Sequence, residues 1–156
     1  MKTDLILVGR TADKQYAKFI DDYRERITHY MPFGIITIPE LKNNKNLSEE
    51  QQKTAEGDLI LKQIQPSDTV VLLDEHGREP RSIELARWLE QKRSTARRLV
   101  FVVGGPYGFS NKVYERANEQ LSLSRLTFSH QMVRLIFVEQ LYRACTIIKG
   151  EPYHHE

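Results

Sequence analysis

Residues 99–108 read Leu-Val-Phe-Val-Val-Gly-Gly-Pro-Tyr-Gly, an apolar run that leads directly into a glycine-rich turn. An unbroken apolar run of this length is typical of a strand that is covered on both faces. Comparable runs in the rest of the chain occupy 5–8, 35–38 and 69–73. These runs predict a buried and mostly parallel sheet.

Segments with helical character separate the runs. Apolar residues recur at helical spacing over 12–30, and Ser48 with Gln51 forms a capping box that opens a second helix. Another helix begins at Ser82, and Ser129 caps a final helix that runs from His130 to about Lys149, after a short strand at 121–124. The alternation predicts an α/β fold in which helices flank the sheet, with 1–156 as one domain.

The composition limits the functions that the chain can have. A formal net charge of only +2 over 156 residues excludes a globally basic surface, so RNA would be contacted through local basic clusters. Basic residues gather at 92–98 and at 78–81, and a solvated helix face is the alternative explanation of the first group. Cys145 is the only cysteine, which excludes an internal disulfide and favours a reducing compartment. The first apolar run is too short for a signal peptide or a membrane span. We therefore expect a cytoplasmic protein without a membrane partner.

Three unusual segments follow the predicted strands. They cover 73–80, 104–110 and 123–130, and the second contains three glycines within five residues. Ligands of open α/β sheets bind beyond the carboxyl ends of the strands, so these segments are candidates for a binding site. The glycines are also compatible with a simple turn. Neither a P-loop lysine nor GxGxxG spacing is present, which argues against a nucleotide-phosphate site.

The final helix is apolar around nearly its whole circumference. A helix of this kind must be covered on all sides. Two interpretations remain open on these residues alone: a central core helix, or a helix that packs on the sheet with one face and on a second copy of the chain with the other. Within it, Glu139 and Arg143 lie one turn apart and can form an ion pair.

The C-terminal tail reads Gly-Glu-Pro-Tyr-His-His-Glu over 150–156. Gly150 and Pro152 give the chain a defined exit from the helix, while Tyr153 and His154 supply an aromatic surface and a titratable imidazole. Adjacent histidines can belong to a metal site, but no cysteine or HExxH partner accompanies them, so we expect no metal.

Several ordered motifs resemble one known family. These are 102–108, 121–124, 127–134 (Thr-Phe-Ser-His-Gln-Met-Val-Arg), 139–144 and 150–154. Together with the opening strand, they are similar over essentially the full length to the ribosomal large-subunit pseudouridine methyltransferases of the H family, in the SPOUT superfamily. Several motifs that occur in the same order and at matching positions are far more specific than a single glycine loop.

The resemblance implies a knotted SPOUT fold, with a deep trefoil in the C-terminal half, and a homodimer. It also implies an enzyme that uses S-adenosyl-L-methionine (AdoMet) as cofactor. The implied reaction is methylation of N3 of a pseudouridine in 23S ribosomal RNA, within the assembled ribosome.

Site residues follow from the resemblance, position by position. The implied catalytic residues are His154, Tyr153 and Arg143, with His130 in support; His154 is the candidate general base. Arg143 would stabilise negative charge or grip a phosphate, and Tyr153 would stack on the base. The implied cofactor-binding residues are Leu73, Gly104, Gly105, Leu123, Ser124, Arg125, Leu126, Thr127 and Phe128.

The chain departs from its relatives at a few positions. His155-Glu156 stands where relatives often end in a basic residue, which weakens the expected phosphate contact of the tail. Two alternative functions also stay open: a SPOUT methyltransferase that acts on transfer RNA, and a non-catalytic AdoMet-binding factor of ribosome assembly.

Overall fold

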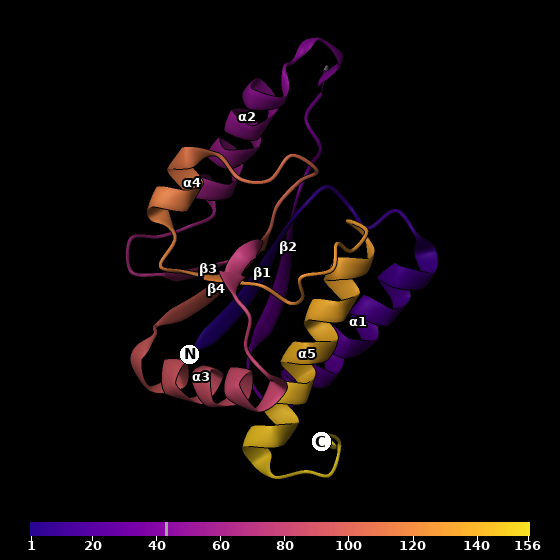
Figure 1. The fold of residues 1–156 in the computed structure, drawn as a ribbon, viewed down its shortest axis with the longest axis vertical. Helices are drawn as coiled ribbons and strands as arrows, with labels where there is room; N and C mark the ends of the chain where they lie inside the picture. The colour runs from indigo at the N-terminus through magenta and orange to yellow at the C-terminus, as the bar shows by residue number, and fades with distance from the viewer. Residues whose placement is uncertain (43) are drawn as a thin grey trace.

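The computed structural model describes residues 1–42 and 44–156. Figure 1 shows the chain with its elements labelled. In chain order they are β1 (Lys2–Val8), α1 (Lys14–Thr28), β2 (Phe33–Ile38), the 3-10 turn η1 (Asn44–Asn46), α2 (Glu49–Lys62), β3 (Thr69–Arg78), α3 (Ser82–Thr95), β4 (Arg98–Val103), α4 (Asn111–Arg116), β5 (Glu119–Leu121) and α5 (Met132–Lys149). The strands form one sheet in the order β2-β1-β4-β3-β5, and every pairing is parallel. The predicted α/β architecture is confirmed.

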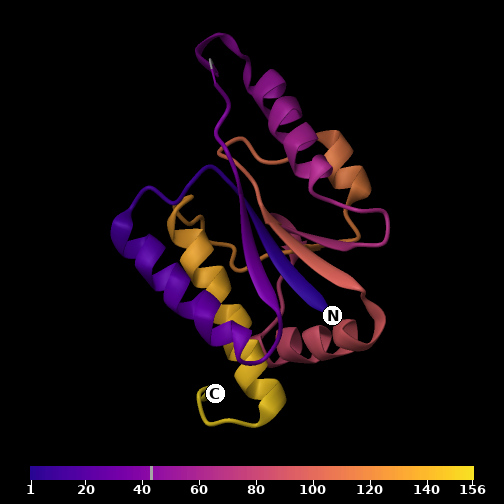
Figure 2. The ribbon, with the colours of Figure 1, turned by 180° about the vertical axis from the view of Figure 1, so that it is seen from behind.

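Helices cover both faces of this sheet. Helices α1, α3 and α5 lie on one face and α2 with α4 on the other, as the two opposite views show (Figures 1 and 2). Alternate residues of β1 enter the two cores: Leu5 and Leu7 pack with α1, α3 and α5, whereas Ile6 and Val8 pack with α2 and α4. Coverage on both faces explains why the strand sequences are continuously apolar. None of the helices in the described part of the chain is long and apolar enough to cross a membrane.

Three predicted boundaries were wrong. Strand β3 continues to Arg78, beyond the predicted end at Leu73, because its last residues pair with Leu121 after a register shift. Strand β5 ends at Leu121, where we expected a strand over 121–124 to begin. Helix α5 begins at Met132 instead of His130; its N-terminal N–H groups bond to Ser129, whose Oγ accepts from Met132 and whose carbonyl accepts from Val133.

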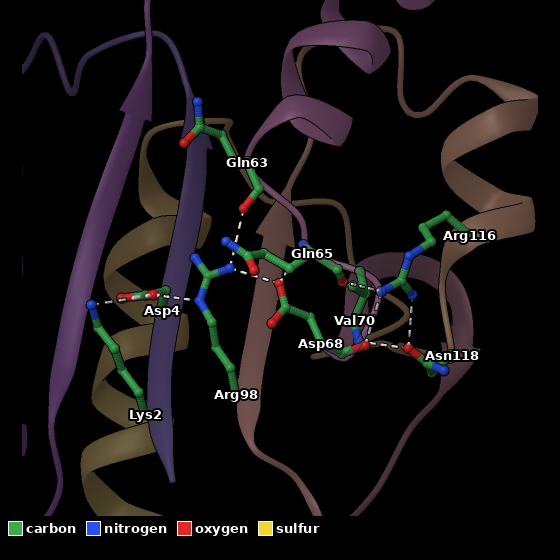
Figure 3. Close-up of polar contacts among 9 residues, drawn as sticks. All are labelled: Lys2, Asp4, Gln63, Gln65, Asp68, Val70, Arg98, Arg116 and Asn118. Carbon is green, nitrogen blue, oxygen red and sulfur yellow. Dashed lines mark hydrogen bonds and ion pairs between the residues drawn. The ribbon is translucent and has the colours of Figure 1, made fainter.

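A charged network ties the amino ends of the strands together (Figure 3). Arg98 at the start of β4 donates to Asp4 of β1 at 2.8 Å and to Asp68, which precedes β3, at 2.7 Å. Both carboxylates have side chains only 3% exposed. Nearby, Arg116 at the end of α4 donates to the carbonyls of Gln65 and Asp68. The network holds the edge of the sheet that lies opposite the candidate ligand site.

The segment from β5 to α5 crosses the segment from β3 to α3 (Figure 1). The two are in close contact: the Ser122 N–H donates to the Arg78 carbonyl at 2.8 Å, and a Cβ added to Gly77 would lie 2.6 Å from the backbone of Leu121. A trefoil knot requires a crossing of this kind, but the knot itself stays a prediction.

Candidate functional site

A cavity of about 670 Å³ opens at the carboxyl ends of β3 and β4. Parts of all three predicted segments, 73–80, 104–110 and 123–130, line it, and so do Val103, Leu121 and Ser122 just before two of them. Parallel strands bring their carboxyl ends to one edge of the sheet, which is why segments distant in sequence meet here. The volume lies within the range of small-molecule sites in proteins.

Close neighbouring side chains explain why glycine occupies two positions of the second segment. A Cβ on Gly104 would lie 3.0 Å from the Phe109 ring, and a Cβ on Gly105 would lie 2.5 Å from Oε1 of Glu56. Gly108 adopts a φ of +82°, which favours glycine. Phe109 and Glu56 therefore pack against one side of the turn. Gly104 and Gly105 also line the cavity.

Asp74 forms a polar part of the cavity wall at the end of the buried section of β3. Its carboxylate accepts from the Tyr114 hydroxyl, from the His76 backbone N–H at 2.9 Å and from the His76 ring at 3.0 Å. Burial alone would raise the pKa of Asp74, but these hydrogen bonds lower it overall. Burial and the same contact raise the pKa of Tyr114. Asp74 is thus ionised and Tyr114 protonated at neutral pH.

The implied cofactor-binding residues line the cavity with one exception. The Ser122 hydroxyl donates to the Ser124 carbonyl, and Oγ of Ser124 accepts from the Leu126 N–H, so short local bonds shape this segment. Leu126 is 74% exposed at the rim. Arg125 points away from the cavity, with a side chain 94% exposed and 3.9 Å from Glu79.

His130 also lines the cavity, just before α5. Burial, assisted by the charge of Arg134, lowers the pKa of His130, so its ring is neutral near pH 7. Arg134 itself is fully buried and donates to the carbonyls of Val8 and Gly9 and to the Thr11 hydroxyl. These bonds fix the start of α5 against the carboxyl end of β1.

The other three implied catalytic residues form a cluster beside the middle and last turns of α5. Arg143 binds Glu139 through two nitrogens, at 2.6 and 3.1 Å, and donates to Nδ1 of His154 at 3.1 Å. The Tyr153 hydroxyl donates to Glu139 at 3.1 Å, and the Arg143 guanidinium lies 4.7 Å from the Tyr153 ring centre. The structure brings these residues together as one group, which we call the tail cluster: Glu139, Arg143, Tyr153 and His154.

The tail cluster and the cavity occupy different stretches of α5. The cavity borders the start of the helix, at His130 and Val133. The tail cluster begins at Glu139, about 9 Å farther along the helix axis than Val133, and continues to the last turns. None of the four residues of the tail cluster lines the cavity.

Several residues of the site carry little signal in the sequence. Glu139, expected only to pair with Arg143, also accepts from Tyr153. Glu56 and Tyr114 were not predicted, because each lies on a helix far along the chain from the strand end that it contacts. The glycine at 57, inside a helix, is the local signal in the sequence that another segment packs closely against this helix. Among residues 1–42 and 44–156, no group of three His, Cys, Asp or Glu side chains is arranged to hold a metal.

Comparison with known proteins places the chain among similar sequences. A family model described as "Predicted SPOUT methyltransferase" matches residues 1–154. The chain is 61% identical to the "Ribosomal RNA large subunit methyltransferase H" of Bacteroides fragilis, over 100% of both chains. The proteins of the same name from Phocaeicola vulgatus and Christiangramia forsetii are 61% and 52% identical, over 100% and 99% of each chain.

Proposed function

Because the chain belongs to the SPOUT methyltransferase family, we propose that it transfers a methyl group from AdoMet to N3 of a pseudouridine in 23S ribosomal RNA. The observation that carries the proposal is the cavity at the carboxyl ends of β3 and β4. Its walls contain the implied cofactor-binding residues except Arg125. Full-length relatives named for the large-subunit RNA support the choice of substrate. The methyltransferase domain would span 1–156 in the cytoplasm.

The cavity suits AdoMet in size and in chemistry. Leu73, Val103, Leu121 and Leu123 supply apolar walls for an adenine ring. The open backbone beside Gly104 can bond the polar edge of that ring. Asp74 offers a negative charge to a cationic cofactor. When bound, AdoMet supplies an electrophilic methyl group on a sulfonium, and the chain has to orient it and exclude water.

The tail cluster supplies the residues that would handle the nucleobase. Burial and the hydrogen bonds to Tyr23 and Glu139 raise the pKa of Tyr153, so its ring stays neutral and can stack on a base. Arg143 can bind the base or a phosphate through the one nitrogen, Nη1, that now contacts His154. N3 carries a proton that must leave for methylation, and His154 is the candidate to accept it.

In the structure, His154 is not yet arranged as a base. An arginine only donates, so Nδ1 of His154 accepts from Arg143, and the proton of the neutral ring is on Nε2. Nε2 has no hydrogen-bond partner among the described residues. If Arg143 turns to the substrate, Nδ1 is freed to accept the N3 proton. Substrate binding would therefore create the base.

A homodimer would bring the two parts of the site together. The tail cluster does not line the cavity of its own chain, but a two-fold arrangement of α5 helices can place it over the cavity of a partner. Helix α5 also retains partly exposed apolar side chains beyond the sheet, among them Met132 and Ile136, which do not pack on either core. With a net charge of only +2, we expect recognition of a shaped ribosomal site and weak binding to free RNA.

Radiolabelled methyl transfer tests the proposal directly. Ribosomes, separated subunits, naked ribosomal RNA and transfer RNA are offered in parallel, and the modified nucleoside is identified after digestion. We expect labelled N3-methylpseudouridine from ribosomes, with far less label in naked RNA. Label in transfer RNA would instead favour the alternative substrate. Calorimetric AdoMet binding without transfer to any RNA would favour a non-catalytic assembly factor.

A further inference from the structure

We propose that Asp74 makes the cavity selective for the charged sulfonium of AdoMet over the neutral thioether of its product. The inference rests on the proposed function, since it assumes that AdoMet occupies the cavity. Its starting point is geometric: the Asp74 side chain is only 6% exposed, yet it forms part of the cavity wall. No arginine or lysine is within 4.0 Å of this carboxylate among the described residues.

The other charged groups at the cavity do not cancel Asp74. Lys53 borders the cavity but pairs with Glu50 at 3.2 Å. Glu75 has a side chain 66% exposed, so water screens its charge. The His76 ring contacts Asp74 directly at 3.0 Å and acts on it as a hydrogen-bond donor. His130 is neutral near pH 7. Negative charge therefore dominates the interior, and a cation is the ligand that it favours.

AdoMet carries two cationic groups, a sulfonium and an ammonium. The hydrogen bonds that Asp74 already makes indicate which of the two it would attract. Tyr114 donates to Oδ2, while the backbone and the ring of His76 both contact Oδ1. An ammonium group needs free acceptor positions for its three N–H donors, and these bonds have already filled most of them. A sulfonium has no donor and needs only a nearby negative charge. Asp74 thus suits the sulfonium better than the ammonium.

The same charge would help product release. In the transfer, the bond between the methyl carbon and sulfur breaks, its electron pair stays on sulfur, and a new bond forms to the substrate nitrogen. The cofactor thereby changes from a sulfonium to a neutral thioether. Attraction to Asp74 is lost at this step, so the product binds more weakly than the cofactor.

Calorimetric titration of the full chain with AdoMet and with S-adenosylhomocysteine tests the proposal. The wild-type chain should bind AdoMet more tightly. Asp74→Asn, with its fold checked by circular dichroism and thermal unfolding, should weaken AdoMet binding by about tenfold, which is about 1.4 kcal/mol. Its binding of S-adenosylhomocysteine should change by less than threefold. Asp74→Glu, which keeps the charge, should retain the preference.

A neighbouring variant serves as the matched control. Glu75→Gln removes one charge from an exposed side chain in the same segment and should change the ratio of the two affinities by less than threefold. Equal weakening of both ligands in Asp74→Asn would place Asp74 at the ammonium and overturn the proposal. A wild-type chain that binds the product more tightly would overturn it without any variant. Failure of the proposed function looks different, because the wild-type chain would then bind neither ligand.

Discussion

At the scale of single residues, the tail cluster is held by specific bonds although it lies at the end of the chain. Chain ends usually fray. Here Gly150 takes a left-handed conformation with φ 75°, and the N–H of Glu151 bonds to the Thr146 carbonyl. The turn sends Tyr153 and His154 back along α5 to Glu139 and Arg143. The last residues of the chain are therefore preorganised for binding.

Loss of the His154 imidazole should slow the reaction strongly. We expect His154→Ala to lower the rate of methyl transfer to ribosomes by about 100-fold, because positioned proton transfer typically contributes that much. The matched control is His155→Ala, a change at the exposed neighbouring residue, which should stay within twofold of wild type. Single-turnover assays at saturating AdoMet measure both. A His154→Ala chain with wild-type rate would remove His154 from the mechanism.

Cys145 offers a pH-dependent probe of the folded state. Burial raises the pKa of its thiol to about 11, and the side chain is 1% exposed. At pH 8 we expect a disulfide reagent to label the native chain at least about 100-fold more slowly than the chain unfolded in urea. Because the folded pKa is raised, this group stabilises the fold fully below the ordinary thiol pKa of 9.0, and the contribution is lost as pH rises toward 11. Fast labelling of the native chain at pH 8 would contradict this burial.

At the scale of elements, Arg98 holds three strands in register. It joins β4 to Asp4 on β1 and to Asp68 before β3, and both carboxylates are nearly inaccessible to water (Figure 3). The sequence analysis had placed Arg98 in a basic cluster for RNA. The structure shows instead that its guanidinium is occupied by these two carboxylates and by the Gln63 carbonyl.

Removal of this guanidinium should destabilise the fold. We expect Arg98→Ala to lower the free energy of unfolding by about 3–5 kcal/mol, because it leaves buried carboxylates without their partner. Urea unfolding followed by circular dichroism measures the change. Arg97→Ala, at the exposed neighbouring residue, should change stability by less than about 0.5 kcal/mol. Similar urea midpoints of unfolding for the two variants would show that the charged network contributes little to stability.

At the scale of the whole molecule, the cavity and the tail cluster occupy different stretches of α5. The cavity borders the start of this helix, and the tail cluster runs from its middle to its end. In the proposed homodimer, each chain would supply its tail cluster to the cavity of the other. The dimer would then be a condition for activity and not only a means of covering apolar surface.

Mixed dimers test this division. Gly105→Asp places a carboxylate against Glu56, which should displace the glycine turn that lines the cavity and so impair cofactor binding, whereas His154→Ala disables the tail. Each variant alone should be inactive, but mixed dimers would combine one intact cavity with the tail of the other chain. After mixing and exchange in equal amounts, we expect about a quarter of the wild-type rate, since half of the dimers carry one working site. No recovery, with exchange verified by mass, would place the tail and the cavity of one chain in the same site.

What the sequence determined by itself was the type of fold and the cavity segments. Continuous apolar runs can only be buried on both faces, so they specified a parallel α/β sheet, and its geometry brings the ends of β3 and β4 together. The end of β5 and the start of α5 were less predictable. A contact between Arg78 and Leu121 sets the first, and residues 130–131 form a turn between the predicted Ser129 and the helix. Only the tertiary structure decided the rest. It turned Arg125 away, placed Asp74 and Tyr114 together, and separated the tail from the cavity, because such contacts depend on distances between segments that no local pattern encodes.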